Sequence, residues 1–396
     1  MSIIKKRNVN HRYEADIIRG ITVISVVAMH TVGTITFVDT NNFWSIIQFM
    51  ILLLLRYNRQ TFIFITAFVL VYVYNKPNLN LINFWKKRTL GIIIPYIIWS
   101  IIYVALYIKN PSLYNYVYAI ITGSAEYQLY YILLAIQLYI LLPFFIKILN
   151  KLKDKVFITL LSLGIFQFLL MSYTYFFLKV NNTNYKFVLR LTHIQYRFIL
   201  FYLVYIFLGG FFALYVNDIE KEFKKNYFKF ILFFILSTLV LLLSYYIEIL
   251  VFHLPIAIAS SFDQPLVISY SLSLIFILYK ISLSISKNKI HLLKKINKSL
   301  VKFFLIVSEA AFGIYLIHPI ILNMVSSNIM FPIYKYNNIP YIGGIIIILG
   351  WMLTVLISLS IVLLIMQIPY LNILVGKYSK YDKRERRKNE ILDTQI

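Results

Sequence analysis

The sequence predicts an all-α, polytopic integral membrane protein with about ten transmembrane helices. Of its 396 residues, 60% are hydrophobic, whereas soluble domains contain about 45–50% apolar residues. The mean hydropathy is +0.77. Apolar stretches of about 20 residues recur, and each is long enough to cross a bilayer core of about 30 Å. Inside the membrane such stretches satisfy their backbone groups as helices, and the alternating segments of a membrane β-barrel are absent.

Ten apolar runs define the expected spans, and together they form a single membrane domain over residues 17–370. The second and tenth runs are long enough to tilt or break. The first is too long for a signal-peptide core and lacks a small-x-small site after it, so we expect it to remain as a helix. The predicted spans are 17–38, 44–74, 90–108, 129–149, 156–178, 198–217, 228–250, 264–283, 301–328 and 340–370.

The charge distribution predicts the topology. The formal net charge of +24 is of a size that also occurs in nucleic-acid-binding proteins, but the basic residues cluster in short loops between apolar runs. With ten spans, the N-terminal side holds 30 of the 39 Lys and Arg residues. The positive-inside rule then places both termini in the cytoplasm, namely a basic N-terminus at 1–16 and a basic tail at 371–396. We therefore expect membrane lipid, and no nucleic acid, as a partner.

Two ionisable residues, Arg19 and His30, lie within the first span with ten residues between them. On an α-helix, eleven steps of about 100° amount to nearly three turns, so the side chains share one face about 16 Å apart along the axis. Ionisable groups at membrane depth usually face a protein interior or a water-filled path. The plainer alternatives are a positive-inside anchor for Arg19 and a helix–helix hydrogen bond for His30.

Four segments resemble the acyltransferase family 3 membrane proteins. The first is DIIRGITVISVVAMH at 16–30, which has the family's Arg, ten residues, His pattern. The others, in the family's order, are FIFITAFVL at 62–70, NFWKKRTLGIIIPYIIW at 83–99 and GIYLIHP at 313–319. The segment YIFLGGFFALYVNDIEK at 205–221 also suits the family's branch that exports or O-succinylates the intercellular-adhesion polysaccharide, poly-N-acetylglucosamine.

Three positions depart from the family pattern. Thr66 and Ala67 replace its usual Ser-Gly pair, and Gly91 stands where a second arginine, three residues after Arg88, is often found. The resemblance nevertheless implies an O-acyltransferase in a bacterial plasma membrane. Acetyl-CoA or succinyl-CoA would be its co-substrate, with no permanently bound cofactor. The acceptor would be a hydroxyl of a cell-surface polysaccharide or lipid-linked glycan, and a glycan synthase complex is a further expected partner.

His30 and Arg19 are the candidate catalytic residues of such a transferase. An imidazole with a pKa of about 6.5 is suited to take a hydroxyl proton near neutral pH, and His30 could also carry the acyl group transiently. Arg19 would position the anionic donor or stabilise developing negative charge. Lys86, Lys87 and Arg88 could bind the phosphates of acyl-CoA, or they could serve only as topology anchors.

Arg56, Arg59, Tyr315 and His318 are the candidate substrate-pocket residues. Arg56 and Arg59 lie within the second span, where lining a cavity and internal ion pairing are both plausible reasons for the charge. His318 precedes Pro319, which leaves a backbone carbonyl without its helical donor, so a structural role beside a kink is an alternative. With no Cys and scattered acidic residues, the sequence supports no metal site.

Two other functional classes remain open. A polysaccharide exporter or flippase without acyl chemistry would need no Arg–His pair but would need a wide path through the membrane. A purely structural subunit of a synthase complex would use its polar residues for helix packing. Unmodified glycan outside the cell after loss of the protein would favour a transferase, and absence of external glycan would favour an exporter.

Overall fold

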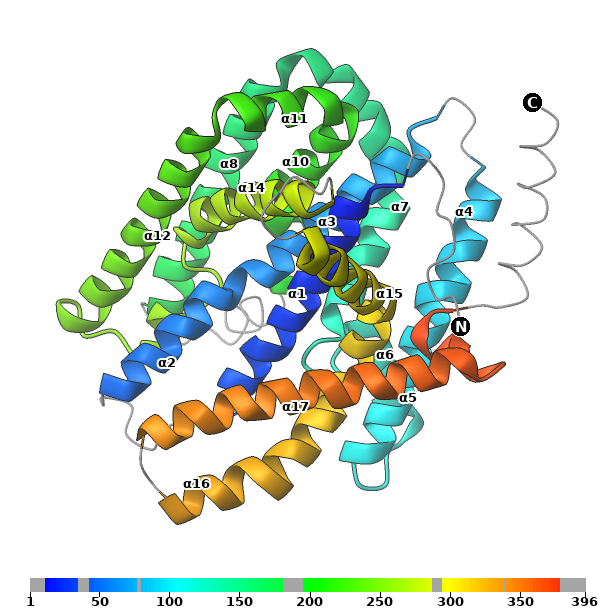
Figure 1. Cartoon of the computed structure of the whole chain (residues 1–396), viewed down its shortest axis with the longest axis vertical. Coiled ribbons are helices and arrows are strands. Elements are labelled where there is room, and N and C mark those ends of the chain that lie inside the picture. The colour runs from blue at the N-terminus through cyan, green and yellow to red at the C-terminus, as the bar shows by residue number, and fades with distance from the viewer. Residues whose placement is uncertain are drawn as a thin grey trace. The chain divides into compact units, whose positions relative to one another are not determined.

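The computed structural model describes residues 11–34, 43–76, 80–180, 195–286, 294–337 and 340–377. Within those ranges every regular element is a helix (Figure 1), which confirms the predicted class. Eight helical segments are long and apolar enough to cross a membrane. They are Tyr13–Val32, Leu81–Tyr107, Tyr130–Lys151, Lys153–Phe176, Tyr227–Leu250, Val267–Ser286, Ser299–Lys335 and Ile342–Gln367. Ile199–Leu214 and Val216–Lys225, bent by 98° at Tyr215, give nine spans if counted as one.

Figure 1 labels most of the α-helices, whose bounds differ by several residues from the predicted spans at many ends. They are α1 (Tyr13–Val32), α2 (Phe43–Leu54), α3 (Asn58–Tyr74), α4 (Leu81–Arg88), α5 (Ile94–Tyr107), α6 (Leu113–Thr122), α7 (Tyr130–Lys151), α8 (Val156–Ser172), α10 (Leu203–Leu214), α11 (Val216–Lys225), α12 (Tyr227–Leu250), α13 (Ile256–Ala259), α14 (Val267–Ser286), α15 (Lys294–Val325), α16 (Phe331–Asn337) and α17 (Pro340–Gln367).

The predicted second span, 44–74, is helical but broken. A tight 3₁₀ turn, η1 (Leu55–Tyr57), separates α2 from α3. The segment 44–74 is not among the eight long apolar segments, and its polar run RYNRQT at 56–61 lowers its mean hydropathy. The tight turn disturbs the regular backbone ladder, and the hydroxyl of Tyr270 on α14 donates to the carbonyl of Leu54 at 2.9 Å. The orientation of the termini stays a prediction.

The chain forms two compact units. The first contains residues 1–74 and 142–309, and the second contains 75–141 and 310–396; of the predicted tail 371–396, only residues 371–377 are described. In the first unit, α1 packs against α3 and α14 (Figure 1). Gly20 permits a close approach to α15, because a Cβ there would lie 3.0 Å from the carbonyl oxygen of Phe304. This places the Arg–His helix in the interior of its unit.

The second unit is organised around the C-terminal part of α15 and the end of the described chain. After α17, a short 3₁₀ turn, η9 (Leu371–Val375), packs against α5 and the π-helical turn η2 (Thr89–Ile93). The indole of Trp99 donates to the carbonyl of Leu374 at 2.8 Å. Gly313 fits against Val362 and Val375, where a Cβ would approach to 2.6 and 2.8 Å. These contacts fix the segment that carries Tyr315 and His318.

Candidate functional site

A polar network surrounds Arg19 in the first unit. The guanidinium donates to Oδ1 of Asp16 at 3.0 Å and to the hydroxyl of Ser308 at 3.5 Å. The Ser308 hydroxyl donates to the same carboxylate oxygen at 3.3 Å. Nε2 of His11 lies 2.6 Å from the other oxygen, Oδ2. The Asp16 side chain is 11% exposed and that of Arg19 is 32% exposed. The carboxylate is therefore enclosed by its donors, whereas the arginine that it binds stays partly exposed.

A second ionic group lies beside it. Arg12 contacts Glu14 of α1 at 3.5 Å and Glu220 of α11 at 3.6 Å, and its guanidinium lies 5.1 Å from the ring centroid of Tyr72 on α3. Three helices are thereby tied together at the start of α1. Neither this group nor Asp16 was singled out by sequence reasoning, although an acidic residue three positions before an arginine is a pairing pattern visible in any helix.

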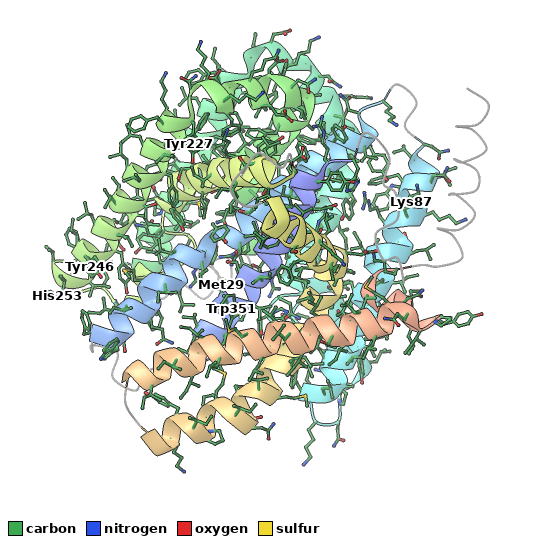
Figure 2. The ribbon with its side chains drawn as sticks, in the orientation of Figure 1. Met29, Lys87, Tyr227, Tyr246, His253 and Trp351 are labelled. Carbon is green, nitrogen blue, oxygen red and sulfur yellow. The ribbon has the colours of Figure 1, made fainter. Side chains whose placement is uncertain are left out.

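His30 lies in the last turn of α1 and is partly exposed; Figure 2 labels its neighbour Met29 on the same helix. One uninterrupted helix therefore carries Arg19 and His30, as the spacing predicted, and their axial separation of about 16 Å follows from the helical rise. The end of the helix is tied to α2, because Gln48 donates to the carbonyl of Val32 at 2.6 Å. The chemical roles of both residues stay predictions.

Arg56 lies within the break between α2 and α3, and Arg59 lies just after it, in the first turn of α3. Nε of Arg56 donates to the carbonyl of Ser260 at 3.1 Å, and the guanidinium of Arg59 lies 4.2 Å from the ring centroid of Phe262. Both partners belong to the connection between α13 and α14. The interruption thus brings two cations and an irregular backbone segment together, an arrangement found where ligands bind at discontinuous membrane helices.

Three further polar residues lie next to the two arginines at this break. Asn58, Gln60 and Thr61 are all buried. Both polar side-chain atoms of Asn58 and the hydroxyl of Thr61 lack hydrogen-bond partners among the described residues. Sequence reasoning missed these three residues because uncharged polar residues are common at helix interfaces in membranes.

The basic cluster Lys86, Lys87 and Arg88 ends α4 in the second unit. The two lysines are exposed, and Figure 2 shows Lys87 projecting from α4. Arg88 is less exposed, with its guanidinium 5.4 Å from the ring centroid of Phe84 and 5.0 Å from that of Tyr139. The cluster therefore divides into two accessible ammonium groups and one arginine stacked on aromatic rings.

Tyr315 and His318 lie together in the second unit, on α15. His318 is fully buried, and its ring centroid lies 6.2 Å from that of Tyr315 and 6.2 Å from that of Tyr127. The Tyr315 hydroxyl donates to the carbonyl of Gln128. Close to this pair, burial raises the pKa of the Glu126 carboxyl above its usual value. In the described part of the chain, no group of three His, Cys, Asp or Glu residues could hold a metal ion.

The candidate residues predicted from the sequence are divided between the two units. Arg19, His30, Arg56 and Arg59 belong to the first unit, and Lys86, Lys87, Arg88, Tyr315 and His318 belong to the second. Within the first, α1 packs directly on η1, the turn that contains Arg56. A second link joins the same elements, since the hydroxyl of Tyr57 donates to Ser25 at 2.9 Å. The helix with the Arg–His pair and the broken span thus form one structural group.

Comparison with known proteins agrees with this description. A family model described as an acyltransferase domain, of the acyltransferase 3 type, matches residues 12–368. No curated protein and no solved structure matches the chain. The matched region begins at Arg12, just before α1, and ends just after α17, so it includes every candidate residue. The chain therefore belongs to the acyltransferase 3 family of multi-pass membrane proteins.

Proposed function

We propose that this protein transfers an acetyl or succinyl group from cytoplasmic acyl-CoA to a hydroxyl of a cell-surface polysaccharide or lipid-linked glycan. The acceptor class we favour is poly-N-acetylglucosamine or a related glycan, at the plasma membrane of a bacterial cell. The observation that carries the proposal is the continuous helix α1, which holds Arg19 in an ionic network and His30 on the same face. Family membership supplies the reaction class.

The chemistry divides between the two residues. His30 takes the proton of the acceptor hydroxyl as that oxygen attacks the thioester carbonyl. The carbon–sulfur bond then breaks, and the proton passes to the leaving thiolate, which yields the new ester and free CoA. Arg19, fixed by Asp16 and Ser308, supplies positive charge to an anionic part of the donor, as preorganised cations do at sites where negative charge gathers. Arg56 and Arg59 contribute further positive charge along the same structural group.

Lys86, Lys87 and Arg88 are the proposed contacts for the phosphates of acyl-CoA. We expect Lys86→Gln combined with Lys87→Gln to raise the KM for acyl-CoA by about three- to tenfold, with the larger effect at low salt, because exposed charges attract anions through a screened field. The matched control is Lys221→Gln on α11, an exposed lysine paired with Asp218. Equal KM values for the cluster variant and this control would assign the lysines to topology alone.

The central test measures free CoA release by purified protein in proteoliposomes. The donors are acetyl-CoA and succinyl-CoA, with and without N-acetylglucosamine oligomers. We expect acceptor-dependent release from the wild type and a loss of at least about 100-fold in His30→Asn, because general-base catalysis contributes about 10²–10⁴-fold. The control is His253→Asn, which changes an exposed histidine at the end of α12 (Figure 2). Its φ of 51° suits asparagine.

Each outcome has a separate meaning. Retention of full transfer activity by folded His30→Asn would refute the role of His30. No release with any donor, from folded wild-type protein, would refute the transferase and direct attention to glycan transport across the same vesicles.

A further inference from the structure

The side chain of His318 is oriented by hydrogen bonds to two backbone carbonyl groups of its own helix, those of Tyr315 and Ile314. In a regular helix the carbonyl of Tyr315 would accept from the N–H of residue 319, but residue 319 is proline and has no N–H. Nδ1 of His318 lies 2.9 Å from that carbonyl oxygen and 3.1 Å from the carbonyl oxygen of Ile314. Both contacts are to acceptors, so Nδ1 carries the hydrogen. In the neutral ring, Nε2 is then a hydrogen-bond acceptor.

A second buried acceptor lies close by, on the segment that joins α6 to α7. Gln128 is 3% exposed, and its Oε1 has no hydrogen-bond partner among the described residues. Its backbone carbonyl accepts from the hydroxyl of Tyr315, and its Nε2 lies 3.5 Å from the hydroxyl of Tyr103. A buried amide oxygen without a donor has lost its hydration without gaining a hydrogen bond, and a ligand with its own O–H groups would supply the missing donor.

The segment that joins α6 to α7 begins with a turn at Gly123, which fixes its path. Gly123 has a φ of 65°, a left-handed conformation that glycine adopts without strain. A Cβ at this position would lie 2.8 Å from Cα of Tyr130, so the segment leaves α6 and packs directly against the start of α7. Tyr127, beside His318, is 45% exposed. The cluster therefore extends from a fully buried imidazole to an accessible aromatic ring.

The charge of the surrounding elements decides between the two substrates. The segments 94–107, 113–131 and 310–325 contain no Lys or Arg, and their one carboxylic acid is Glu126. The connection between α5 and α6 adds one exposed lysine, Lys109. An acyl-CoA with several phosphates would meet at most that single cation. A glycan fits better, since its hydroxyls donate to nitrogen and oxygen acceptors and its apolar ring faces pack on aromatic side chains such as Tyr127 and Tyr131.

We propose that His318 Nε2 and Gln128 Oε1 bind hydroxyl groups of the acceptor glycan, with neighbouring tyrosines as the ring-packing surface. The inference rests on the proposed transferase function, and it assigns this cluster to the acceptor rather than to the acyl donor. His318 and Gln128 are binding residues in this account.

The decisive variant is His318→Asn. The asparagine amide is placed to donate to the carbonyls of Tyr315 and Ile314 in place of Nδ1, but it has no counterpart of Nε2. We expect its thermal stability to stay near that of the wild type. Its KM for N-acetylglucosamine oligomers should rise about tenfold or more, since the loss of one hydrogen bond to a buried site is worth about that factor. The KM for acetyl-CoA or succinyl-CoA should not change.

Gln128→Met gives an independent test, because methionine has a similar length and no strong acceptor. Its control is Gln367→Met, an exposed glutamine at the end of α17. Saturable binding of N-acetylglucosamine oligomers to detergent-solubilised protein, followed by tyrosine fluorescence, gives a readout that needs no catalysis. We expect weaker binding in His318→Asn and Gln128→Met and unchanged binding in Gln367→Met.

Several results would overturn the inference. One is an unchanged acceptor KM and oligomer affinity in folded His318→Asn and Gln128→Met. Another is the absence of oligomer binding to the wild type. A raised KM for the acyl-CoA donor alone would assign the cluster to the donor. Failure of the transferase is recognised separately, because wild-type protein would then release no CoA while oligomer binding would still respond to the two substitutions.

Discussion

Gly209→Ala is expected to abolish or severely reduce the yield of folded protein. Gly209 lies where α10 packs on α3, and a Cβ built there would overlap the carbonyl oxygen of Phe64 and lie 3.0 Å from the backbone nitrogen of Phe68. Backbone atoms cannot rotate away as a side chain can, so α3 and α10 would have to separate. Small residues at helix interfaces in membranes permit this kind of close backbone contact. Overpacking costs typically about 1–3 kcal/mol and sometimes more.

The matched control is Gly164→Ala on α8. A Cβ at Gly164 would meet nothing within 4 Å, so only the helix propensity changes, which favours alanine by about 1 kcal/mol. The measurement is the midpoint of thermal unfolding in detergent, monitored by size-exclusion chromatography. A Gly209→Ala variant with the yield and midpoint of Gly164→Ala would show that α3 and α10 do not approach as closely as described.

The same contact gives a physical reason for one departure from the family pattern. Ala67 is fully buried, and a Cβ at Gly209 would lie 3.1 Å from the Cβ of Ala67. Relative to the family's usual glycine, Ala67 adds a methyl group on α3, and the absence of a side chain at Gly209 on α10 leaves room for it. The other departure, Gly91, has no structural explanation of this kind, because a Cβ there would meet only the carbonyl oxygen of Gly376 at an ordinary 3.6 Å. The pairing of Ala67 with Gly209 could not be predicted from the local sequence.

Hydropathy predicts the helical class because a membrane helix satisfies its backbone within about 20 consecutive residues. The length of the second run predicts that it tilts or breaks, but hydropathy does not place the 3₁₀ turn at residues 55–57, beside which Tyr270 on α14 donates to the carbonyl of Leu54. The spacing of Arg19 and His30 gives their shared face, because one uninterrupted helix fixes that relation. The hydrogen-bond partners of these residues cannot be predicted in the same way, because Ser308, which accepts from Arg19, lies 289 residues further along the chain.

Local sequence also conceals the environment of His318. The presence of Pro319 shows that a carbonyl needs a new donor, but only the side-chain geometry identifies Nδ1 of the preceding histidine as that donor. The tyrosines and Gln128 of the 113–131 region appear in sequence as packing residues. Their assignment to one cluster with His318 requires α15 to meet the connection between α6 and α7.

Asp16→Asn is the second change for which we expect a large effect, on activity as well as stability. The Asp16 carboxylate contacts Arg19, Ser308 and His11 through its two oxygens. An amide at this position loses the negative charge, and its N–H group replaces either the acceptor of Arg19 and Ser308 or the acceptor of His11. Hydrogen bonds to charged groups contribute about 1.5–3 kcal/mol, so we expect a lower unfolding midpoint. If Arg19 positions the donor, acceptor-dependent CoA release should also fall by about tenfold or more, since 1.4 kcal/mol corresponds to a factor of ten.

The structure provides a closely matched control in Asp218→Asn. Asp218 contacts Lys221 at 3.2 Å with the same spacing of three residues, but both side chains are at least 70% exposed. Exposed pairs of this kind contribute about 0–1 kcal/mol, so this variant should behave as the wild type. Ser308→Ala should fall between the two, because it removes one neutral donor and leaves the Asp16–Arg19 contact. Equal activity and stability in Asp16→Asn and Asp218→Asn would mean that the network around Arg19 is incidental, and Arg19 would then act as a topology anchor rather than as part of the site.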